Sequence, residues 1–236
     1  MTEAQPHHRR SVLLVGASRG LGHAMASEFT KNNWRVVGTV REGGRAELND
    51  LADAHPDQVS IELLDITEPV QIAALRDRLC GSFDILFVNA GTANHDQDET
   101  IAETSTEEFI RVMLTNVLGV MRTIEGLQNL VRPDGLIGVM SSGQGSIANN
   151  EKGGHEVYRG SKAALNQYMR CYAARHRDDQ RALVLMAPGW IRTALGGAHA
   201  PFSIAETIPE LVSTLIAQQG RPGLRFIDRH GANVAW

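Results

Sequence analysis

The sequence predicts an α/β fold, a doubly wound parallel sheet of about seven strands with helices on both faces. Short apolar runs rich in β-branched residues alternate with longer segments whose apolar residues recur every three or four positions. The short runs lack regular polar alternation, which is typical of parallel strands buried on both faces. With 236 residues, 42% of them hydrophobic, the chain can bury one sizeable core.

The predicted strands are short segments bounded by glycine, proline or polar residues: 11–15, 35–40, 59–64, 84–88, 136–140, 182–186 and 224–227. Amphipathic helices are expected between them; the first has the apolar stripe Leu21, Met25 and Phe29. Thr67 and Thr207, each followed by a proline two residues later, mark two helix starts. The remaining helices are expected over 45–54, 106–131 and from the region of Tyr158 to about 177.

No repeat, linker or low-complexity segment interrupts this alternation. Residues 11–236 are therefore expected to form a single domain behind a flexible N-terminal segment, residues 1–10. A formal net charge of −4 argues against a general nucleic-acid binder, which needs an excess of lysine and arginine. The N-terminus has no apolar leader, and no segment approaches the roughly 20 apolar residues of a membrane span. We therefore expect a cytoplasmic protein without a membrane partner.

The cysteines and histidines predict neither a disulfide framework nor a metal site. Cys80 and Cys171 both fall in predicted helices beside apolar residues, and we expect buried free thiols in a reducing compartment. Nine histidines are present, but none forms an HxxxH pair, and His95, His155 and His199 fall in separate loops. Exposed loop histidines are the simplest interpretation.

A glycine-rich turn with the spacing Gly16-x-x-x-Gly20-x-Gly22 follows the first predicted strand and leads into a helix. At such a junction the unpaired amide groups and the positive end of the helix dipole converge, which suits a phosphate group. The spacing differs from the commoner GxGxxG, and a glycine triplet also suits a plain strand–helix turn. Its position directly after the first strand favours the binding of a dinucleotide.

Arg41 follows the second predicted strand, at the place where NAD-specific enzymes usually carry an acidic residue for the ribose hydroxyls. No acidic residue occurs there before Glu42. Together with Arg19 of the glycine turn, Arg41 could bind the extra 2′-phosphate of NADP, because a guanidinium matches phosphate geometry. We therefore expect NADP(H) rather than NAD(H); the alternative is two solvated surface arginines.

Two further strand ends carry residues that suit a bound nucleotide. Asp65 and Ile66 follow the third predicted strand, where their side chains could contact an adenine. Asn89-Ala90-Gly91 follows the fourth, and small residues just past a parallel strand allow a ligand to approach the backbone closely. The small residues of this second motif also suit an ordinary strand exit.

The segment Tyr158-Arg159-Gly160-Ser161-Lys162 is the strongest candidate for chemistry. On a helix, residues four apart share a face, so the Tyr158 hydroxyl and the Lys162 ammonium can act at one point. A nearby cation favours the phenolate and is expected to lower the pKa of Tyr158, which would make it a proton shuttle. The alternative is an exposed tyrosine and lysine on an ordinary amphipathic helix.

Polar residues on neighbouring elements could complete such a site. Asn116 interrupts the apolar stripe of the helix predicted over 106–131, where it could form a structural hydrogen bond or orient a water molecule beside the lysine. The fifth strand runs into Ser141, Ser142 and Ser146, and serines at a strand exit more often cap and turn than catalyse. If one of them reacts, Ser142 is preferred, while Ser141 and Ser146 stay open.

Taken together, these motifs resemble the short-chain dehydrogenase/reductase family over essentially the whole chain. They occur in the family's order: Gly16-x-x-x-Gly20-x-Gly22, Asp65, Asn89-Ala90-Gly91, Asn116, Ser142, Tyr158-x-x-x-Lys162 and Pro188-Gly189-x-x-x-Thr193. Four further features resemble the C-factor-like, carbonyl-reductase-like branch of the family: Ser146-Ile147, the form Tyr158-Arg159-Gly160-Ser161-Lys162, Pro188-Gly189-Trp190-Ile191 and the ending in Trp236. Val15, where the family often has threonine, and the long gap between Ser142 and Tyr158 depart from the pattern.

The resemblance implies a Rossmann-type fold with a catalytic tetrad of Asn116, Ser142, Tyr158 and Lys162. Ser142, whose spacing to Gly145 matches the family, would hold the substrate oxygen while Tyr158 donates a proton. Lys162 would bind the nicotinamide ribose and depress the tyrosine pKa. Hydride would pass between the nicotinamide ring and the carbonyl carbon. Together with Arg41, the implied cofactor-binding residues are Gly16, Ser18, Arg19, Gly20, Leu21, Gly22, Asp65, Ile66, Asn89, Ala90, Gly91, Tyr158, Lys162, Pro188, Gly189, Ile191 and Thr193.

Two functions from different classes fit these observations. The first is an NADP(H)-dependent reductase or dehydrogenase for a small carbonyl or alcohol substrate, working as the homodimer or homotetramer common in the family. The second is a dinucleotide-sensing binding or signalling protein on the same fold with little or no turnover. Sensors usually lose members of the tetrad, whereas this chain keeps all four, which favours the enzyme. The loops after Gly91, Ser142 and Thr193 are expected to form the substrate pocket.

Overall fold

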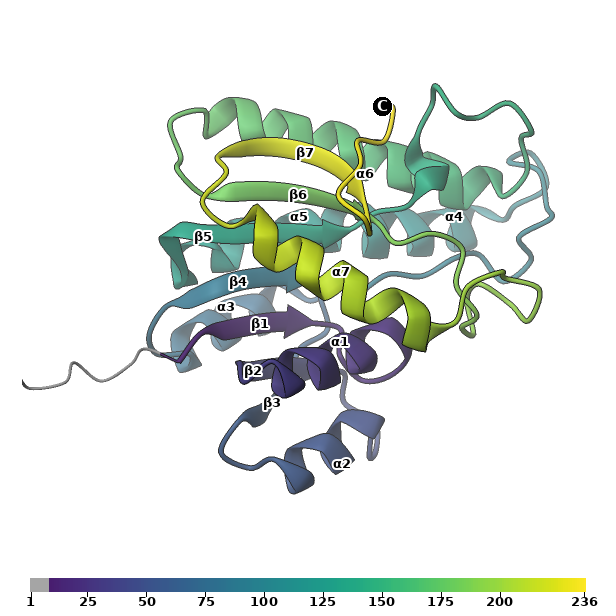
Figure 1. Cartoon of the computed structure of the whole chain (residues 1–236). Helices are drawn as coiled ribbons and strands as arrows, with labels where there is room; N and C mark the ends of the chain where they lie inside the picture. Colours follow the sequence, from purple (N-terminus) through teal and green to yellow (C-terminus); the bar gives the residue numbers. More distant parts are fainter. Residues whose placement is uncertain (1–8) are drawn as a thin grey trace, which may run out of the picture.

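A computed structural model describes residues 9–236 and contains one seven-stranded sheet with helices on both faces (Figure 1). The strands are β1 (Ser11–Val15), β2 (Arg35–Val40), β3 (Val59–Leu63), β4 (Phe83–Val88), β5 (Val131–Met140), β6 (Ala182–Ala187) and β7 (Gly223–Asp228). The α-helices are α1 (Gly20–Lys31), α2 (Glu47–Ala54), α3 (Pro69–Arg78), α4 (Thr106–Met113), α5 (Val120–Leu127), α6 (Glu156–Arg175) and α7 (Ile204–Gln218). Most of the segment expected to be flexible, 1–10, lies outside the described residues.

All neighbouring strands pair in parallel, in the order β3-β2-β1-β4-β5-β6-β7. The strand order reverses between β1 and β4, so the connections after these two strands lead to opposite sides and leave a crevice at their carboxyl ends. Gly16 follows β1 and Asn89 follows β4, and both therefore lie at this crevice. The predicted fold class is confirmed, including the number of strands.

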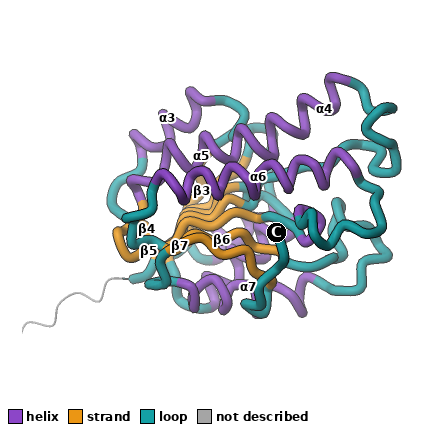
Figure 2. The backbone as a smooth tube through the Cα atoms, turned by 90° about the horizontal axis from the view of Figure 1, so that it is seen from above, coloured by secondary structure: helices purple, strands orange, loops and turns teal. Residues whose placement is uncertain are grey.

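The core has two layers, one on each face of the sheet, because side chains alternate along each strand. In β1, Val12 and Leu14 belong to one layer, and Leu13 and Val15 to the other. The first layer packs against α1, α2 and α7, and the second against α3, α5 and α6. Figure 2 shows the strands between α7 on one side and α3, α5 and α6 on the other. Burial on both faces explains why the strands are continuous apolar runs in the sequence.

The segment 106–131 departs from the single helix expected there. A π-helical turn, Leu114–Gly119, separates α4 from α5, and a 3₁₀ turn, Gln128–Leu130, follows α5. Asn116 is buried within the π-helical turn. Val131, expected to end the helix, instead begins β5 and pairs with Phe83 before an irregularity in the register. Apolar spacing alone does not reveal such a turn, since it shifts the stripe by only one residue.

Helix α7 begins before the predicted Thr207. Ser203 Oγ accepts a hydrogen bond from the Glu206 amide at 3.2 Å, and the Glu206 carboxylate accepts one from the Ser203 amide at 2.8 Å. This capping box fixes the start at Ile204 and places Pro209 inside the helix. Along residues 9–236, no helix is both long and apolar enough to cross a membrane.

The expectation of buried cysteines is wrong, because Cys80 and Cys171 are both exposed. Cys80 lies just beyond α3, and Cys171 lies on the solvent side of α6, next to the buried Tyr172. Apolar neighbours in the sequence do not decide which face of a helix a residue occupies.

Candidate active site

Glycines let the turn after β1 approach the exit of β4. Gly16 has a φ of 85°, and a Cβ added there would lie 2.7 Å from the Ala90 nitrogen. A Cβ at Gly22 would lie only 2.0 Å from the Gly16 carbonyl oxygen. Asn89 Nδ2 donates a hydrogen bond to that same oxygen at 2.8 Å. The ends of the two strands are thus joined across the crevice, as close approach at the glycine turn requires.

The amino end of α1 is free to receive an anion. Among the described residues, no side chain caps its first amide groups, and its first turn carries no acidic residue. The helix dipole adds partial positive charge at this end, which suits a phosphate. The predicted turn residues Gly16, Ser18, Arg19, Gly20, Leu21 and Gly22 all lie at this end.

A cavity of about 620 Å³ opens beside the glycine turn. Arg19 and Arg41 line it, and neither guanidinium forms an ion pair with any residue of the described chain. Arg45 also lines it, but its Nε donates to Asp50 at 3.0 Å and its Nη2 to Asp53 at 2.6 Å. Two guanidinium groups without ion pairs in one cavity have the charge and geometry that suit a phosphate group.

The two residues after β3 are placed differently. Asp65 lines the cavity, and its Oδ1 accepts hydrogen bonds from the Thr67 amide at 2.9 Å and the Thr67 hydroxyl at 2.7 Å. Ile66 is 4% exposed and packs in the core layer beside α3 and α5. This burial shows that the Ile66 side chain packs in the core, and its contact with an adenine stays a prediction.

The exit of β5 and the first turns of α6 bring Ser142, Tyr158 and Lys162 together. Lys162 Nζ lies 5.8 Å from the centre of the Tyr158 ring, one helical turn away. The hydroxyls of Ser142 and Tyr158 form a hydrogen bond. Lys162 is 3% exposed, and its Nζ donates to the carbonyl oxygen of Met140 at 2.9 Å. The predicted pairing of Tyr158 and Lys162 in one region is thus present in the fold.

Burial governs the proton affinity of this pair. It raises the pKa of Tyr158 to about 12, and the hydrogen bond with Ser142 offsets only part of that rise. Burial also lowers the pKa of Lys162 to about 8, because the ammonium ion loses water. The expected depression of the tyrosine pKa is therefore not found, since desolvation of the phenolate outweighs the favourable interactions. At neutral pH Tyr158 is a phenol that can donate its proton.

Asn116 joins the loop after β4 to α6. Its Nδ2 donates to the Thr92 carbonyl at 2.7 Å and to Ser161 Oγ at 2.9 Å, and its Oδ1 accepts from the Thr92 amide at 2.8 Å. These contacts favour the structural role that the sequence left open. Gly91 lies where the site converges, because a Cβ there would be 3.3 Å from Asn116 Oδ1 and 3.4 Å from Lys162 Nζ.

The candidate serines have separate partners. Ser141 is 2% exposed, and its Oγ donates to Asn166 Oδ1 at 2.6 Å. Ser146 is 1% exposed, and its Oγ accepts from a backbone amide of its own loop at 3.1 Å. Ser142 is the serine whose hydroxyl contacts Tyr158. Asn166 was not anticipated; the only signal was its position four residues after Lys162, on the same helix face.

The segment after β6 carries the remaining predicted residues. Gly189 has a φ of 96°, and the carbonyl oxygen of Pro188 accepts a hydrogen bond from Arg229 at 3.2 Å. Ile191 is 3% exposed, and Thr193 Oγ1 accepts from the Gly196 amide at 3.0 Å. These contacts give the segment a defined turn beyond the strand, and none of them involves Tyr158 or Lys162.

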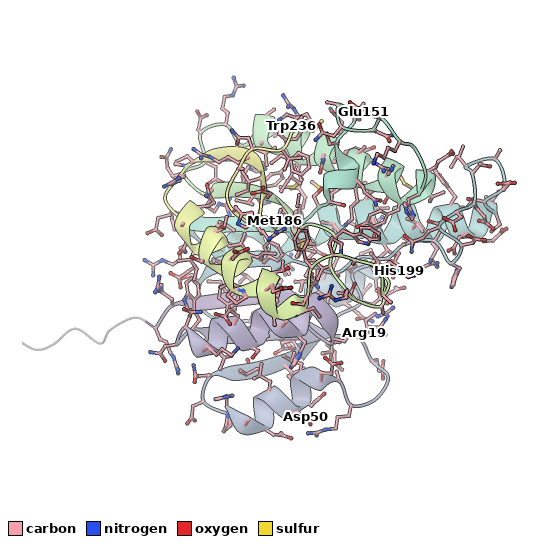
Figure 3. The ribbon with its side chains drawn as sticks, turned by 45° about the vertical axis from the view of Figure 1, so that its right-hand side comes forward. Arg19, Asp50, Glu151, Met186, His199 and Trp236 are labelled. Atoms are coloured by element: carbon pink, nitrogen blue, oxygen red, sulfur yellow. The ribbon has the colours of Figure 1, made fainter. Side chains whose placement is uncertain are left out.

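Loops from distant parts of the chain meet around the site. The loop after β4 touches the loop after β6, where Gln97 Nε2 donates to the Leu195 carbonyl at 3.5 Å. The loop after Ser142 is held at Ala148, whose amide donates to the main-chain oxygen of Trp236 at 2.9 Å. Figure 3 labels Arg19, Glu151 and His199, from the glycine turn and two of these loops, toward the right-hand side of the view.

Comparisons with known proteins show the family to which a chain with this fold and these motifs belongs. A family model described as enoyl-(acyl carrier protein) reductase matches residues 16–211. The C-signal protein of Myxococcus xanthus is 28% identical over 158 residues, which cover 66% of this chain and 94% of that protein. A structure from Burkholderia multivorans, described as a short-chain dehydrogenase/reductase with bound NADP, has a TM-score of 0.95 and 59% identity, covering 97% of this chain and all (100%) of that one.

A carbonyl reductase of Pseudomonas aeruginosa PAO1, solved in complex with NADP, has a TM-score of 0.89 and 30% identity and covers 97% of this chain and 100% of its own. The span matched by the family model runs from the glycine turn into α7 and includes Asn116, Ser142, Tyr158 and Lys162. The chain therefore belongs to the short-chain dehydrogenase/reductase family.

Proposed function

We propose that the protein is an NADP(H)-dependent oxidoreductase that transfers a hydride between the cofactor and a carbonyl or alcohol group of a small substrate. The observation that carries this proposal is the hydrogen-bonded pair of Ser142 and Tyr158 hydroxyls beside the buried Lys162. The glycine turn lies across the same crevice, at the exits of β1 and β4. The similar proteins solved with NADP add support.

NADP(H) fits the residues around the glycine turn. The uncapped end of α1 would hold the pyrophosphate, and the unpaired guanidinium groups of Arg19 and Arg41 would bind the 2′-phosphate. Asp65 lies in the same cavity, where it would meet the adenosine. When bound, the nicotinamide ring supplies or accepts the hydride.

The protein residues would supply proton transfer and orientation. In the direction of reduction, Tyr158 donates its proton to the carbonyl oxygen, and its raised pKa keeps that proton in place at neutral pH. Ser142 hydrogen-bonds the same oxygen and keeps it within reach of the phenol. Lys162 would hydrogen-bond a ribose hydroxyl and stabilise the phenolate left after transfer. Asn116 acts through structure, by fixing Thr92 and Ser161 around the site.

Substitution of Tyr158 by phenylalanine tests this proposal. The variant keeps the aromatic ring but loses the transferable proton. We expect oxidation of NADPH with aldehydes, ketones and quinones to fall by about 10²–10⁴-fold, while NADPH still binds. Unchanged turnover of every carbonyl compound that the wild-type enzyme reduces would refute the assigned role.

A dinucleotide-binding signalling protein is the alternative, suggested by the similarity to the C-signal protein. It predicts that the wild-type protein binds NADPH but oxidises it with no compound in a broad carbonyl panel. The two functions are therefore distinguished by the wild-type protein alone.

We also propose that the protein is a homodimer or homotetramer. Large apolar side chains are exposed on α4 and on the π-helical turn that follows it: Phe109 is 39% exposed, Ile110 55% and Leu118 44%. Contiguous exposed apolar surface is typical of an interface. Light scattering coupled to size-exclusion chromatography would measure the mass, and a monomer at micromolar concentration would contradict this assignment.

A further inference from the structure

One face of α6 carries Tyr158, Lys162 and Asn166 at intervals of four residues. Tyr158 and Lys162 belong to the proposed reaction, whereas Asn166, one turn further along, has no part in it. Asn166 is 4% exposed, so its amide is desolvated and needs partners. Both partners come from the segment that contains Ser142.

Asn166 contacts the chain on both sides of Ser142. Its Oδ1 accepts a hydrogen bond from Ser141 Oγ at 2.6 Å, and its Nδ2 donates to the carbonyl oxygen of Gly145 at 3.3 Å. Gly145 is pressed against α6, because a Cβ there would lie 3.0 Å from both Asn166 Nδ2 and Lys162 Cβ. The residue before Ser142 and the third residue after it are therefore both fixed to the helix that carries Tyr158.

These contacts also determine which serine reaches Tyr158. The backbone at Ser142 is extended, with φ −159° and ψ 149°, and successive side chains of an extended chain point to different sides. Since the Ser141 hydroxyl is directed to Asn166, the Ser142 hydroxyl is directed away from it and meets Tyr158. Backbone hydrogen bonds and the Gln144 amide, which donates to Ser142 Oγ at 3.1 Å, also hold this segment, but the Asn166 contacts are the side-chain hydrogen bonds that fix it to α6.

We propose that Asn166 is a positioning residue for Ser142: by fixing Ser141 and Gly145 to α6, it holds the Ser142 hydroxyl against Tyr158. The inference rests on the proposed function, in which Ser142 and Tyr158 handle the substrate oxygen. Displacement of a reacting group by about 1 Å can reduce the rate by about 10²-fold, so small movements of this segment matter.

Three variants separate the contacts. Asn166→Ala removes both hydrogen bonds, and we expect kcat/KM to fall by about 10- to 100-fold while NADPH affinity, measured by calorimetry, stays within about twofold. Asn166→Asp keeps the acceptor for Ser141 but places a carboxylate oxygen beside the Gly145 carbonyl, and should show a loss of similar size. Ser141→Ala leaves α6 untouched and should show a smaller loss in the same direction.

Thr30→Ala is a matched control for loss of a buried hydrogen bond. Thr30 is 6% exposed, and its Oγ1 donates to the Ala26 carbonyl at 2.8 Å near the far end of α1. This variant should lose stability but retain kcat/KM. A comparable loss of activity in Thr30→Ala would mean that activity merely follows stability, which would overturn the positioning role.

A double-mutant cycle gives the decisive result. If Asn166 acts through Ser142, then Asn166→Ala should reduce kcat/KM by less than about threefold in a Ser142→Ala background. An unchanged 10- to 100-fold loss in that background would overturn the inference while leaving the reductase proposal intact. Full activity in Ser142→Ala alone would instead refute the role of Ser142 in the proposed function.

Discussion

Replacement of Lys162 by methionine should change how the stability of the protein depends on pH. Lys162 is 3% exposed, and burial lowers its pKa from 10.5 to about 8. Below that pKa the folded protein contains a desolvated ammonium ion, which lowers its free energy of unfolding. Methionine has a similar length and no charge, so the variant lacks this titration.

The order of the two pKa values of Lys162 decides whether stability rises or falls with pH. The folded-state pKa lies below the unfolded-state pKa, so the unfolded chain binds more protons between about pH 8 and 10.5. The contribution of Lys162 to the free energy of unfolding is therefore fully present above pH 10.5 and is lost as the pH falls through the folded-state pKa of about 8. Each pKa unit corresponds to about 1.4 kcal/mol, so the fall from 10.5 to about 8 lowers the free energy of unfolding by roughly 3 kcal/mol when the lysine is charged. About 1 kcal/mol of this loss is recovered when the pH is raised from 7 to 9.

Urea denaturation of the wild-type protein and Lys162→Met at pH 7 and pH 9 measures this difference. The wild type should gain about 1 kcal/mol of unfolding free energy relative to the variant between the two pH values. Lys162→Met also loses the hydrogen bond to Met140, but this loss lowers the stability at both pH values and largely cancels in the change between them. The titration of other groups occurs in both proteins and cancels likewise. A parallel pH dependence of the two proteins would refute the depressed lysine pKa.

Three further substitutions and one chemical modification test the rest of the site and fold. Arg41→Asp should weaken NADPH binding by about tenfold or more relative to NADH, because a guanidinium is replaced by a carboxylate that repels the 2′-phosphate; an unchanged ratio of the two dissociation constants would show that Arg41 does not contact that phosphate. Gly22→Ala should prevent dinucleotide binding, since its Cβ would lie 2.0 Å from the Gly16 carbonyl oxygen. Gly160→Ala should instead raise the free energy of unfolding by about 0.5–1 kcal/mol, because no atom beyond its chain neighbours and its own helix backbone lies within 4 Å of the new Cβ. Equal effects of the two glycine substitutions on NADPH binding would contradict the close approach at the glycine turn. Both Cys80 and Cys171 should react with a thiol reagent in the native protein, and protection of either until unfolding would contradict their exposure.

The sequence predicted the sheet because its signals are local. Runs such as residues 11–15 are buried on both faces, so every residue in them is apolar or small. Such a strand can be predicted from its own sequence, without knowledge of the strands that pair with it. The glycine turn could also be predicted, because close contacts at Gly16 and Gly22 permit only glycine and therefore leave a glycine pattern in the sequence. The pairing of Tyr158 and Lys162 followed from helical periodicity alone.

Other features depend on contacts between distant segments and had no local signal. The π-helical turn at Asn116 accompanies hydrogen bonds to Thr92 and Ser161, which lie on other elements. The raised pKa of Tyr158 depends on the amount of protein packed around it, and residue spacing carries no measure of that burial. The choice of Ser142 over Ser141 depends on Asn166, whose partners are known only from the fold.

The most direct test of hydride transfer with proton donation by Tyr158 follows a deuterium label from NADPH to the product. With deuterium on the transferring position of the cofactor and a carbonyl substrate found in the panel, mass spectrometry should detect one deuterium on the new alcohol carbon. Tyr158→Phe should bind the labelled cofactor as tightly as the wild type yet form almost no labelled alcohol. Labelled product formed by Tyr158→Phe at the wild-type rate would contradict the central role of this phenol.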